Sequence, residues 1–524
     1  MQKNNKKFNI IHPFLLSLCP VLFIYSQNIR ETPVQEVILL TLLVLFAAAL
    51  LWLLTRFIIK NNEKSSFIIS LLLVLSFSYG HIYLLVDDFT LGNTDIGRHQ
   101  YLLIPFAISF VAGIYYFVKT KRKLNNASTI SNAIVVTFLA VTLMSIVTYN
   151  IENIDSFDSE LITTETSLGT YDPTIETFTP RQGEIKNYPD VYYIVLDAYS
   201  SASSLKKFVN FDNQEFVSYL TNKGFSVNHK SYSNYDRTIP SITSTMNMMY
   251  LNSLTEEQVG NLWLKDEMLV KSTVLQNFKS AGYKNIILHR AITIFNDSPL
   301  SDLEMCKKSK FTNSQLLSMT IRTSILGFLL EKWELQQMRD AALCNFSELQ
   351  KQHQKFDEPI FVFSHILVPH PPYLFSAEGK PVSSARPQGL EDWDYKEGYI
   401  NSVKFANKKI MQVVDELLSD PENQPVIIIQ ADHGSYFDFD AGKPSKENIE
   451  QHMSILSAYY LPNVEENLSD GVITPVNTFR TVFNSYFNTD YDLLENKMYW
   501  IDYDDVFDDT PDYLVDVTNV LIQP

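Results

Sequence analysis

The stretch that decides the fold is Val191-Tyr192-Tyr193-Ile194-Val195-Leu196-Asp197, an apolar run closed by an aspartate. A second run, Val426-Ile427-Ile428-Ile429-Gln430-Ala431, is closed by Asp432-His433-Gly434. Continuous apolar runs of this length are typical of parallel strands buried on both faces. Ligand sites of open α/β sheets lie beyond the carboxyl ends of such strands. The sequence therefore predicts that Asp197, Asp432 and His433 converge at one edge of a sheet.

Helical and extended segments alternate around these two strands. This alternation predicts an α/β domain with a mostly parallel sheet between helices. Residues 313–355 carry apolar side chains at three- and four-residue spacing, which predicts a helix with a core-facing stripe. The other expected elements are a helix around 212–223, a strand at 285–288, a strand at 360–364 and a helix at 396–418.

A hydroxyl follows between the two strand-end motifs, in Thr238-Ile239-Pro240-Ser241. Two carboxylates, an imidazole and a hydroxyl suit one divalent ion, and a threonine needs such activation to act as a nucleophile. We expect Asp197, Thr238, Asp432 and His433 to bind that ion, with Thr238 as the catalytic nucleophile. The nitrogen ligand favours manganese or zinc, while magnesium and calcium stay open. The nearby hydroxyls of Ser241, Thr243, Ser244 and Thr245 are the alternatives.

This constellation resembles the alkaline phosphatase and sulfatase superfamily over roughly residues 187–490. The resemblance includes residues 361–373, which contain His365 and His370 beyond the expected strand 360–364. It implies that either histidine binds a phosphoryl oxygen or protonates a leaving alkoxide. Arg237, beside the nucleophile, would neutralise phosphate charge. Structural histidines and a surface arginine are the alternatives, and whether a second metal binds stays open.

The nucleophile segment argues against a true sulfatase. Sulfatases of this superfamily oxidise a Cys or Ser, followed by a Pro and an Arg, to an aldehyde. Here Pro240 is kept, but Ile242 stands at the arginine position, and oxidation of Thr238 would give a ketone.

Residues 1–149 are mostly apolar, and five segments are close to the ~20 residues that span a bilayer. Lys and Arg residues gather before the first segment and after the second and fourth, which predicts a cytoplasmic N-terminus and residues after 150 outside. A cleaved signal peptide is the alternative for the first segment. The expected spans are 11–29, 36–59, 66–86, 100–118 and 130–149.

The expected division is a five-helix transmembrane region at 1–149, a linker at 150–186 and an extracytoplasmic catalytic domain at 187–524. This order resembles lipoteichoic acid synthases and lipid A phosphoethanolamine transferases. The net charge of −17 leaves no basic stripe for nucleic acid. Of the three cysteines, Cys306 and Cys344 lie in the external part, where a disulfide is permitted, but the sequence does not settle whether they pair.

Together these features predict an enzyme in a bacterial inner membrane. It would transfer a phosphorylated headgroup, phosphoglycerol or phosphoethanolamine, from a lipid donor to an envelope glycan or lipid acceptor. A hydrolase of the same superfamily and a non-catalytic membrane protein that retains the fold are the alternatives. The sequence gives no indication of the headgroup, the acceptor or the oligomeric state.

Overall fold

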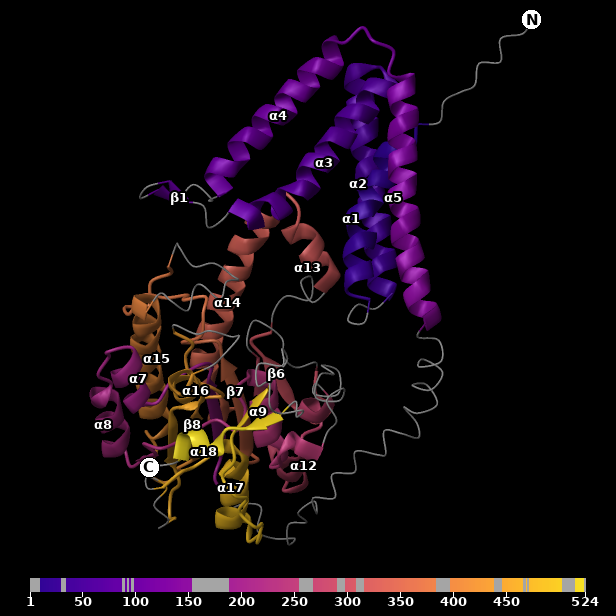
Figure 1. Cartoon of the computed structure of the whole chain (residues 1–524). Helices are drawn as coiled ribbons and strands as arrows, with labels where there is room; N and C mark the ends of the chain where they lie inside the picture. Colours follow the sequence, from indigo (N-terminus) through magenta and orange to yellow (C-terminus); the bar gives the residue numbers. More distant parts are fainter. Residues whose placement is uncertain are drawn as a thin grey trace, which may run out of the picture. The chain divides into compact units, whose positions relative to one another are not determined.

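Two compact units make up the chain (Figure 1). One comprises Met1–Asp172 and Ser309–Trp333, and the other comprises Pro173–Lys308 and Glu334–Pro524. The computed structural model describes residues 10–29, 34–86, 90–91, 94–95, 99–152, 188–253, 267–289, 297–307, 315–382, 396–437, 445–464, 468, 471–501 and 514–522.

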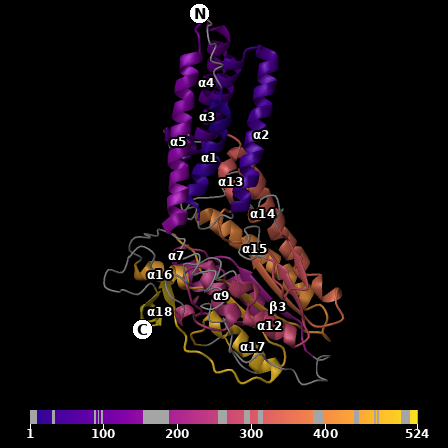
Figure 2. The same cartoon turned by 90° about the vertical axis from the view of Figure 1, so that its right-hand side faces the viewer.

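The first unit is built from apolar helices, of which α1, α2 and α5 run side by side in both views (Figures 1 and 2). In the described part of the chain, four helices are long and apolar enough to cross a membrane, whereas α1 is shorter and contains Pro20. A membrane core needs ~20 residues of helix, so the structure supports four of the five expected spans by length and gives the first as a shorter apolar helix. The helices are α1 (His12–Gln27), α2 (Val34–Ile59), α3 (Asn62–Val86), α4 (His99–Lys119) and α5 (Asn125–Glu152).

The region expected as one helix over 313–355 is two helices. They are α13 (Gln315–Arg322) and α14 (Gly327–Leu349), while residues 313 and 314 lie outside the described part. Their start belongs to the helical unit, because Leu316 is buried with Val21 and Leu40 of α1 and α2. The prediction of a core-facing apolar stripe is therefore correct at Leu316, but the core that buries this start is that of the first unit.

The second unit contains a seven-stranded sheet in the order β4-β9-β8-β3-β7-β5-β6. Strands β8, β3, β7, β5 and β6 are parallel, and β9 and β4 pair antiparallel at the other side of the sheet. The expected mostly parallel sheet is thus confirmed. The strands are β3 (Val191–Leu196), β4 (Ser226–Val227), β5 (Lys284–Leu288), β6 (Leu303–Met305), β7 (Ile360–Ile366), β8 (Val426–Gln430) and β9 (Ser457–Tyr460).

Both faces of this sheet are covered, as the apolar strand runs require. Alternate residues of β3 point to opposite sides, so that Tyr192 and Ile194 enter one core and Tyr193 and Val195 enter the other. The first core includes residues of α7 (Ala202–Phe208), α8 (Gln214–Asn222), the second half of α14, and α15 (Lys396–Leu417). The second core includes residues of α9 (Thr238–Asn247), α12 (Thr273–Ser280) and α17 (Thr478–Phe487).

Aromatic side chains dominate the second core. The rings of Phe278 and Phe361 stack with centroids 4.3 Å apart, and Phe479 meets Phe361 edge-on at 5.7 Å. Burial of each such ring contributes about 1.5–3 kcal/mol. Ile242 and Met246 of α9, the helix that carries Thr238, are buried in the same core, which holds α9 against the face of the sheet.

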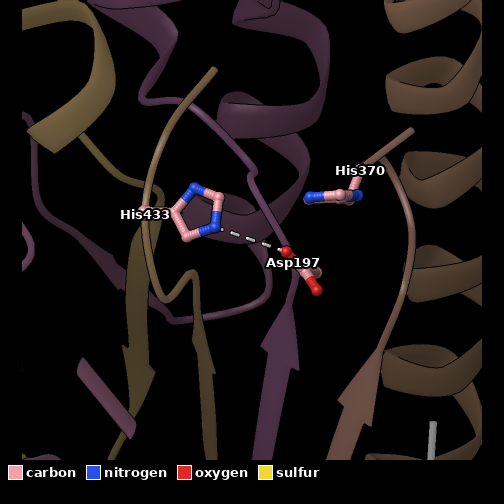
Figure 3. Close-up of side chains that lie close together, drawn as sticks. All are labelled: Asp197, His370 and His433. Carbon is pink, nitrogen blue, oxygen red and sulfur yellow. Dashed lines mark ion pairs between the residues drawn. The ribbon is translucent and has the colours of Figure 1, made fainter. Parts of the chain in front are cut away.

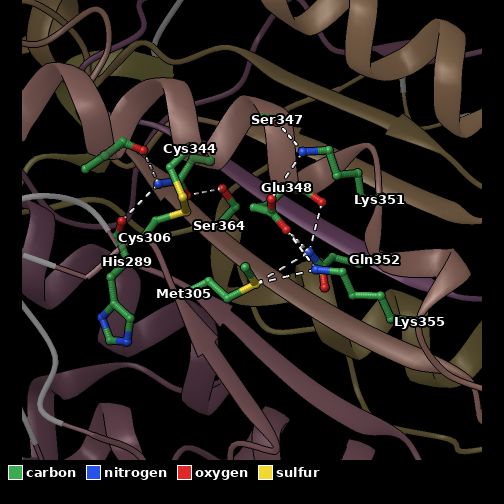
Figure 4. Close-up of a disulfide and its surroundings, with 12 residues drawn as sticks. His289, Met305, Cys306, Cys344, Ser347, Glu348, Lys351, Gln352, Lys355 and Ser364 are labelled. Atoms are coloured by element: carbon green, nitrogen blue, oxygen red, sulfur yellow. Dashed lines mark hydrogen bonds and ion pairs between the residues drawn. A yellow bond between two sulfur atoms is a disulfide. The ribbon is translucent and has the colours of Figure 1, made fainter.

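A disulfide joins Cys306, directly after β6, to Cys344 in α14 (Figure 4). The pairing that the sequence left open is therefore made. Beside it, Asn345 donates to the carbonyl of His289 and accepts from Ser364 of β7. The disulfide and this bridge tie the outer strands β5 and β6 to the helix that covers them.

The remaining elements lie in the C-terminal part of the chain. Helix α16 (Lys446–Met453) begins with a capping box in which Ser445 and Asn448 bond each other's backbone amides. A small antiparallel pair, β10 (Tyr499–Ile501) and β11 (Leu514–Asp516), packs against it through Met498 and Trp500. The last described helix is α18 (Thr518–Ile522).

Candidate metal and nucleophile site

The candidate ligands stand at the carboxyl ends of three neighbouring strands. Strand β3 lies between β7 and β8, and Val195 is in register with both His365 and Gln430. Asp197 follows β3, and Asp432 follows β8 by one residue. His365 lies inside β7, because this strand continues to Ile366 and does not end at residue 364 as expected. Strand order therefore brings the predicted residues together.

Backbone hydrogen bonds fix the loops that follow the strands. The amide of Asp197 donates to the Ile366 carbonyl at 3.0 Å, and the amide of His370 donates to the Asp197 carbonyl at 3.1 Å. Ala198 has a φ of 63°, in the left-handed region that non-glycine residues seldom adopt. Its amide donates to Asp432 Oδ1 at 3.1 Å. The unusual conformation thus links the β3 loop directly to the second carboxylate.

Two carboxylates and two imidazoles converge in the buried part of the site. His365 Nε2 lies 3.3 Å from Asp197 Oδ2 and 3.8 Å from Asp432 Oδ2. His433 Nε2 lies 3.6 Å from Asp197 Oδ1 and 3.7 Å from Asp432 Oδ2. Figure 3 shows His433 and His370 on either side of Asp197. All of these side chains except His370 are buried.

This donor set fits a divalent cation. Asp197 forms one group with His365 and Asp432 and another with His370 and His433, and in each group the candidate ligand atoms lie within 4.8 Å of one another. Among the described residues, the buried Asp432 Oδ2 has no hydrogen-bond partner. Buried charges are costly unless paired or bound to a metal, so two adjacent carboxylates call for a cation.

Thr238 lies beside the same group. It is the first residue of α9, and its Oγ1 is 3.2 Å from His433 Nε2. The start of a helix favours negative charge, such as that of a phosphate group. Thr238 is therefore placed where a phosphoryl group can meet both the hydroxyl and the candidate ligands.

The neighbouring hydroxyls of α9 are buried and differently engaged. Ser241 donates to the Asp432 carbonyl at 2.8 Å, Ser244 to the Met249 carbonyl at 2.6 Å and Thr245 to the Ser241 carbonyl at 2.9 Å. Thr238 is only half-buried. Accessibility therefore favours Thr238 among the hydroxyls that the sequence left as alternatives.

A family model described as Sulfatase matches residues 189–484, more than half of the chain. The chain belongs to the sulfatase family. This confirms the superfamily that the sequence motifs indicated. No curated protein matches the chain.

Solved structures that match this sulfatase-family chain do so at low similarity. The C-terminal periplasmic domain of EcEptC from Escherichia coli, in complex with zinc, is 13% identical with a TM-score of 0.43, over 65% of this chain and 95% of that one. The integral membrane lipooligosaccharide phosphoethanolamine transferase A (EptA) from Neisseria meningitidis is 11% identical with a TM-score of 0.38, over 91% of this chain and 95% of that one. The lipoteichoic acid synthase LtaP from Listeria monocytogenes is 11% identical with a TM-score of 0.34, over 59% of this chain and 75% of that one.

In this sulfatase-family domain, the two remaining predicted site residues, His370 and Arg237, lie at the rim of the site. The ring of His370 is half-buried, with its centroid 6.1 Å from that of His433, and its Nδ1 contacts the Pro371 carbonyl. The side chain of Arg237 is 53% exposed, with Nε 3.6 Å from Asp236 Oδ2. His370 thus lies next to the ligand group, whereas the guanidinium of Arg237 lies beside an aspartate.

Asp236 and His452 form a layer beneath the site, and neither was among the predicted site residues. His452 is buried, its Nε2 bonds the Asp236 carbonyl, and its ring centroid lies 4.7 Å from that of His433 and 3.4 Å from that of Tyr436. Burial lowers the pKa of His452 well below its ordinary value, and His433 acts in the same direction. Burial also raises the pKa of Asp236 to about 6, although Arg237 opposes that change.

This layer connects the nucleophile loop to the metal loop. The carbonyl of His452 accepts from the Gly434 amide. The ring of His452 bonds the carbonyl of Asp236, two residues before Thr238. A Cβ on Gly434 would lie 2.5 Å from the Gln451 carbonyl oxygen, so only glycine permits this approach. No sequence spacing marks His452, because its role depends on these tertiary contacts.

Proposed function

We propose that the chain transfers a phosphorylated headgroup, phosphoglycerol or phosphoethanolamine, from a membrane lipid to a cell-envelope glycan or lipid. The observation that carries the proposal is the half-buried Thr238 hydroxyl, 3.2 Å from His433 Nε2 and next to two buried carboxylates. Membership of the sulfatase family supports enzymatic activity, and the apolar helices support a substrate in the membrane.

One divalent ion would be held by Asp197, Asp432 and His433 together with Thr238. His365 is a further candidate ligand, because its Nε2 lies 3.3 Å from Asp197. When bound, such an ion lowers the pKa of a ligated hydroxyl and offsets phosphate charge. Oxygen ligands combined with imidazole favour manganese or zinc over magnesium or calcium.

In the first half-reaction, Thr238 Oγ1 forms a bond to the phosphorus of the donor phosphodiester. The bond from phosphorus to the diacylglycerol oxygen breaks, and that oxygen takes a proton from a neighbouring acid, for which His370 is the candidate. The proton of the Thr238 hydroxyl leaves to water. Arg237 would bind the phosphoryl oxygens after turning away from Asp236.

In the second half-reaction, an acceptor hydroxyl attacks the same phosphorus, the bond to Thr238 Oγ1 breaks, and Thr238 Oγ1 takes back a proton from water. His370, now neutral, takes the proton of the acceptor hydroxyl. A hydrolase shares the first half-reaction and uses water in the second. Thr238 cannot be oxidised to the aldehyde of true sulfatases, because oxidation of a threonine hydroxyl gives a ketone.

In the proposed arrangement, residues 1–149 span a bacterial inner membrane. Residues 150–186 form a linker to the catalytic domain, residues 187–524, which lies outside the cytoplasm. Helices in the bilayer would keep the site near its lipid donor and raise the encounter rate. A single helix would suffice for an anchor, so the larger number of apolar helices supports a lipid substrate.

The test is an assay of the purified full chain in vesicles that contain a phospholipid labelled in its headgroup, with and without an envelope glycolipid. Transfer predicts diacylglycerol and labelled glycolipid in equal amounts, both lost in Thr238→Ala. Release of free phosphorylated headgroup would instead support the hydrolase. Absence of diacylglycerol under all metal conditions would contradict both and leave the non-catalytic alternative.

A further inference from the structure

A segment within the sulfatase-family match packs with the membrane helices. Residues 315–333 lie inside the matched range 189–484 but belong to the helical unit. The amide of Ile325 donates to the Ser76 carbonyl of α3 at 2.8 Å, and the amide of Gly80 donates to the Thr323 carbonyl at 3.1 Å. The turn between α13 and α14 is thus hydrogen-bonded to the backbone of a predicted membrane span.

Gly80 permits this contact. A Cβ at Gly80 would lie 2.5 Å from both the Arg322 carbonyl oxygen and the Thr323 Cα, which is closer than side chains tolerate. Small residues have the same role where membrane helices approach one another closely. The approach is therefore a built contact between α3 and the segment.

The segment exposes apolar side chains in the part that lacks charged residues. Residues 323–330, between Arg322 and Glu331, contain no charged side chain. Leu326 and Leu329 are each 52% exposed. Helix α3, to which the turn is bonded, also exposes Val74 and Leu84. Both the bonded turn and α3 thus expose apolar side chains, as helices that face lipid do.

Three hydroxyl groups of the segment donate to carbonyl groups within it. Thr320 Oγ1 donates to the Leu316 carbonyl at 2.8 Å, Thr323 Oγ1 to the Met319 carbonyl at 3.2 Å and Ser324 Oγ to the Ile321 carbonyl at 2.8 Å. Inside a bilayer, polar groups need such internal partners because water is absent. The three hydroxyls therefore place no requirement for water on this segment.

The first charged residue after the apolar stretch is paired to the helical unit. Glu331 Oε2 lies 3.0 Å from His99 Nε2 of α4, and His99 Nδ1 lies 2.9 Å from the Tyr79 hydroxyl. Tyr83 stacks on the same imidazole with ring centroids 3.9 Å apart. These contacts hold the start of α14 against α3 and α4.

We propose that residues 315–333 form a membrane-embedded anchor, in which Leu326 and Leu329 contact the acyl chains of the leaflet where α3 ends. The occupant of this apolar surface is lipid, because the turn is bonded to α3, a candidate membrane span, and the uncharged residues 323–330 carry the exposed leucines. The anchor requires only that α3 spans a membrane and is independent of the proposed reaction. It gives the family domain a membrane contact of its own, separate from the link through residues 150–186.

The test uses a fluorophore sensitive to its surroundings on single introduced cysteines of the full chain. Cys19 is buried and the other two cysteines are paired, so an introduced cysteine is the reactive thiol. Labels at Leu326→Cys and Leu329→Cys are compared in phosphatidylethanolamine and phosphatidylglycerol vesicles with and without brominated acyl chains. Phe46→Cys, 71% exposed on α2, is the lipid-facing reference.

Asp340→Cys is the matched control. It is exposed on α14, eleven residues after Leu329 and so on nearly the same helix face, but in the other unit. The anchor predicts that brominated lipid quenches labels at 326 and 329 to the same extent as at 46, and leaves the label at 340 unchanged. The proposal would be overturned if brominated lipid left the labels at 326 and 329 unquenched, like the label at 340. That result would mean that water or a second protein chain covers these positions. A label at 46 without quenching would instead show that the helices are not in the bilayer.

Discussion

The hydroxyl oxygen of Thr238 lies 3.2 Å from Nε2 of His433, although the two residues come from different strand-to-helix connections. Thr238 begins α9, and His433 follows β8. The contact joins the proposed nucleophile to the proposed metal ligands. It follows from the sheet order, which places β8 beside β3, and from the packing of α9 on the sheet.

Thr238→Ala should reduce turnover by at least ~10³-fold, because the nucleophile is removed. Thr238→Ser should keep part of the activity, since it retains the hydroxyl. Thr243→Val is the matched control in the same helix. The Thr243 hydroxyl is buried without a hydrogen-bond partner among the described residues, so a methyl group should replace it at little cost. Initial rates in vesicles measure all three, and normal turnover by Thr238→Ala would rule out this nucleophile.

Asp432→Asn should lose the divalent ion while the protein stays folded. An asparagine oxygen can still accept from the amides of Ala198 and His433, as Asp432 Oδ1 does, but it carries no charge. His433→Ala should have the same effect, because it removes the nitrogen ligand. Metal content per chain after purification is the measurement, with Asp415→Asn, at an exposed ion pair with Lys223, as the control. Full metal content in both site variants would refute the ligand assignment.

The strands and the residues at their ends could be predicted because the evidence is local. The runs at 191–196 and 426–430 are strands with these bounds, and Asp197, Asp432 and His433 follow them as expected. The end of β7 was placed two residues early, since Ser364 and His365 are polar and nevertheless continue the buried strand. A polar residue at a functional site breaks the apolar pattern without ending the strand.

The packing of residues 315–333 and the role of His452 could not be predicted. An apolar helical stripe has the same period whether it faces a sheet or a set of helices, and the bond between Ile325 and Ser76 connects distant parts of the sequence. His452 reaches the Asp236 carbonyl only because α16 folds back onto the nucleophile loop. Contacts of this kind leave no periodic pattern in one sequence.

Reduction of the bond between Cys306 and Cys344 should lower the stability of the chain by about 3–4 kcal/mol, because the closed loop is 38 residues long. The thermal unfolding midpoint in detergent, with and without a reductant, is the measurement. The Cys306→Ser/Cys344→Ser variant should show the lower midpoint under both conditions. Cys19→Ser should respond to reductant as the unaltered chain does. A midpoint that reductant leaves unchanged in the unaltered chain would contradict the expected contribution.

A reporter that is active only outside the cytoplasm should be active when fused after residue 150 and inactive when fused after residue 60. The alternation of basic and acidic loops carries this expectation. The disulfide agrees with it, since such bonds persist in oxidising compartments. The reverse pattern of reporter activity would contradict the orientation. An N-terminus missing from the purified protein would support the alternative of a cleaved signal peptide.

The central claim is that Thr238 carries the phosphorylated headgroup between donor and acceptor. Mass spectrometry of the full chain, quenched in acid during turnover of the donor lipid without acceptor, tests it most directly. We predict the mass of the headgroup phosphoryl on a peptide that contains Thr238, with fragmentation placing it on that hydroxyl and with none on Thr238→Ala. A modification mapped to Ser241, Thr243, Ser244 or Thr245, or turnover with no modified peptide at any time, would contradict the claim.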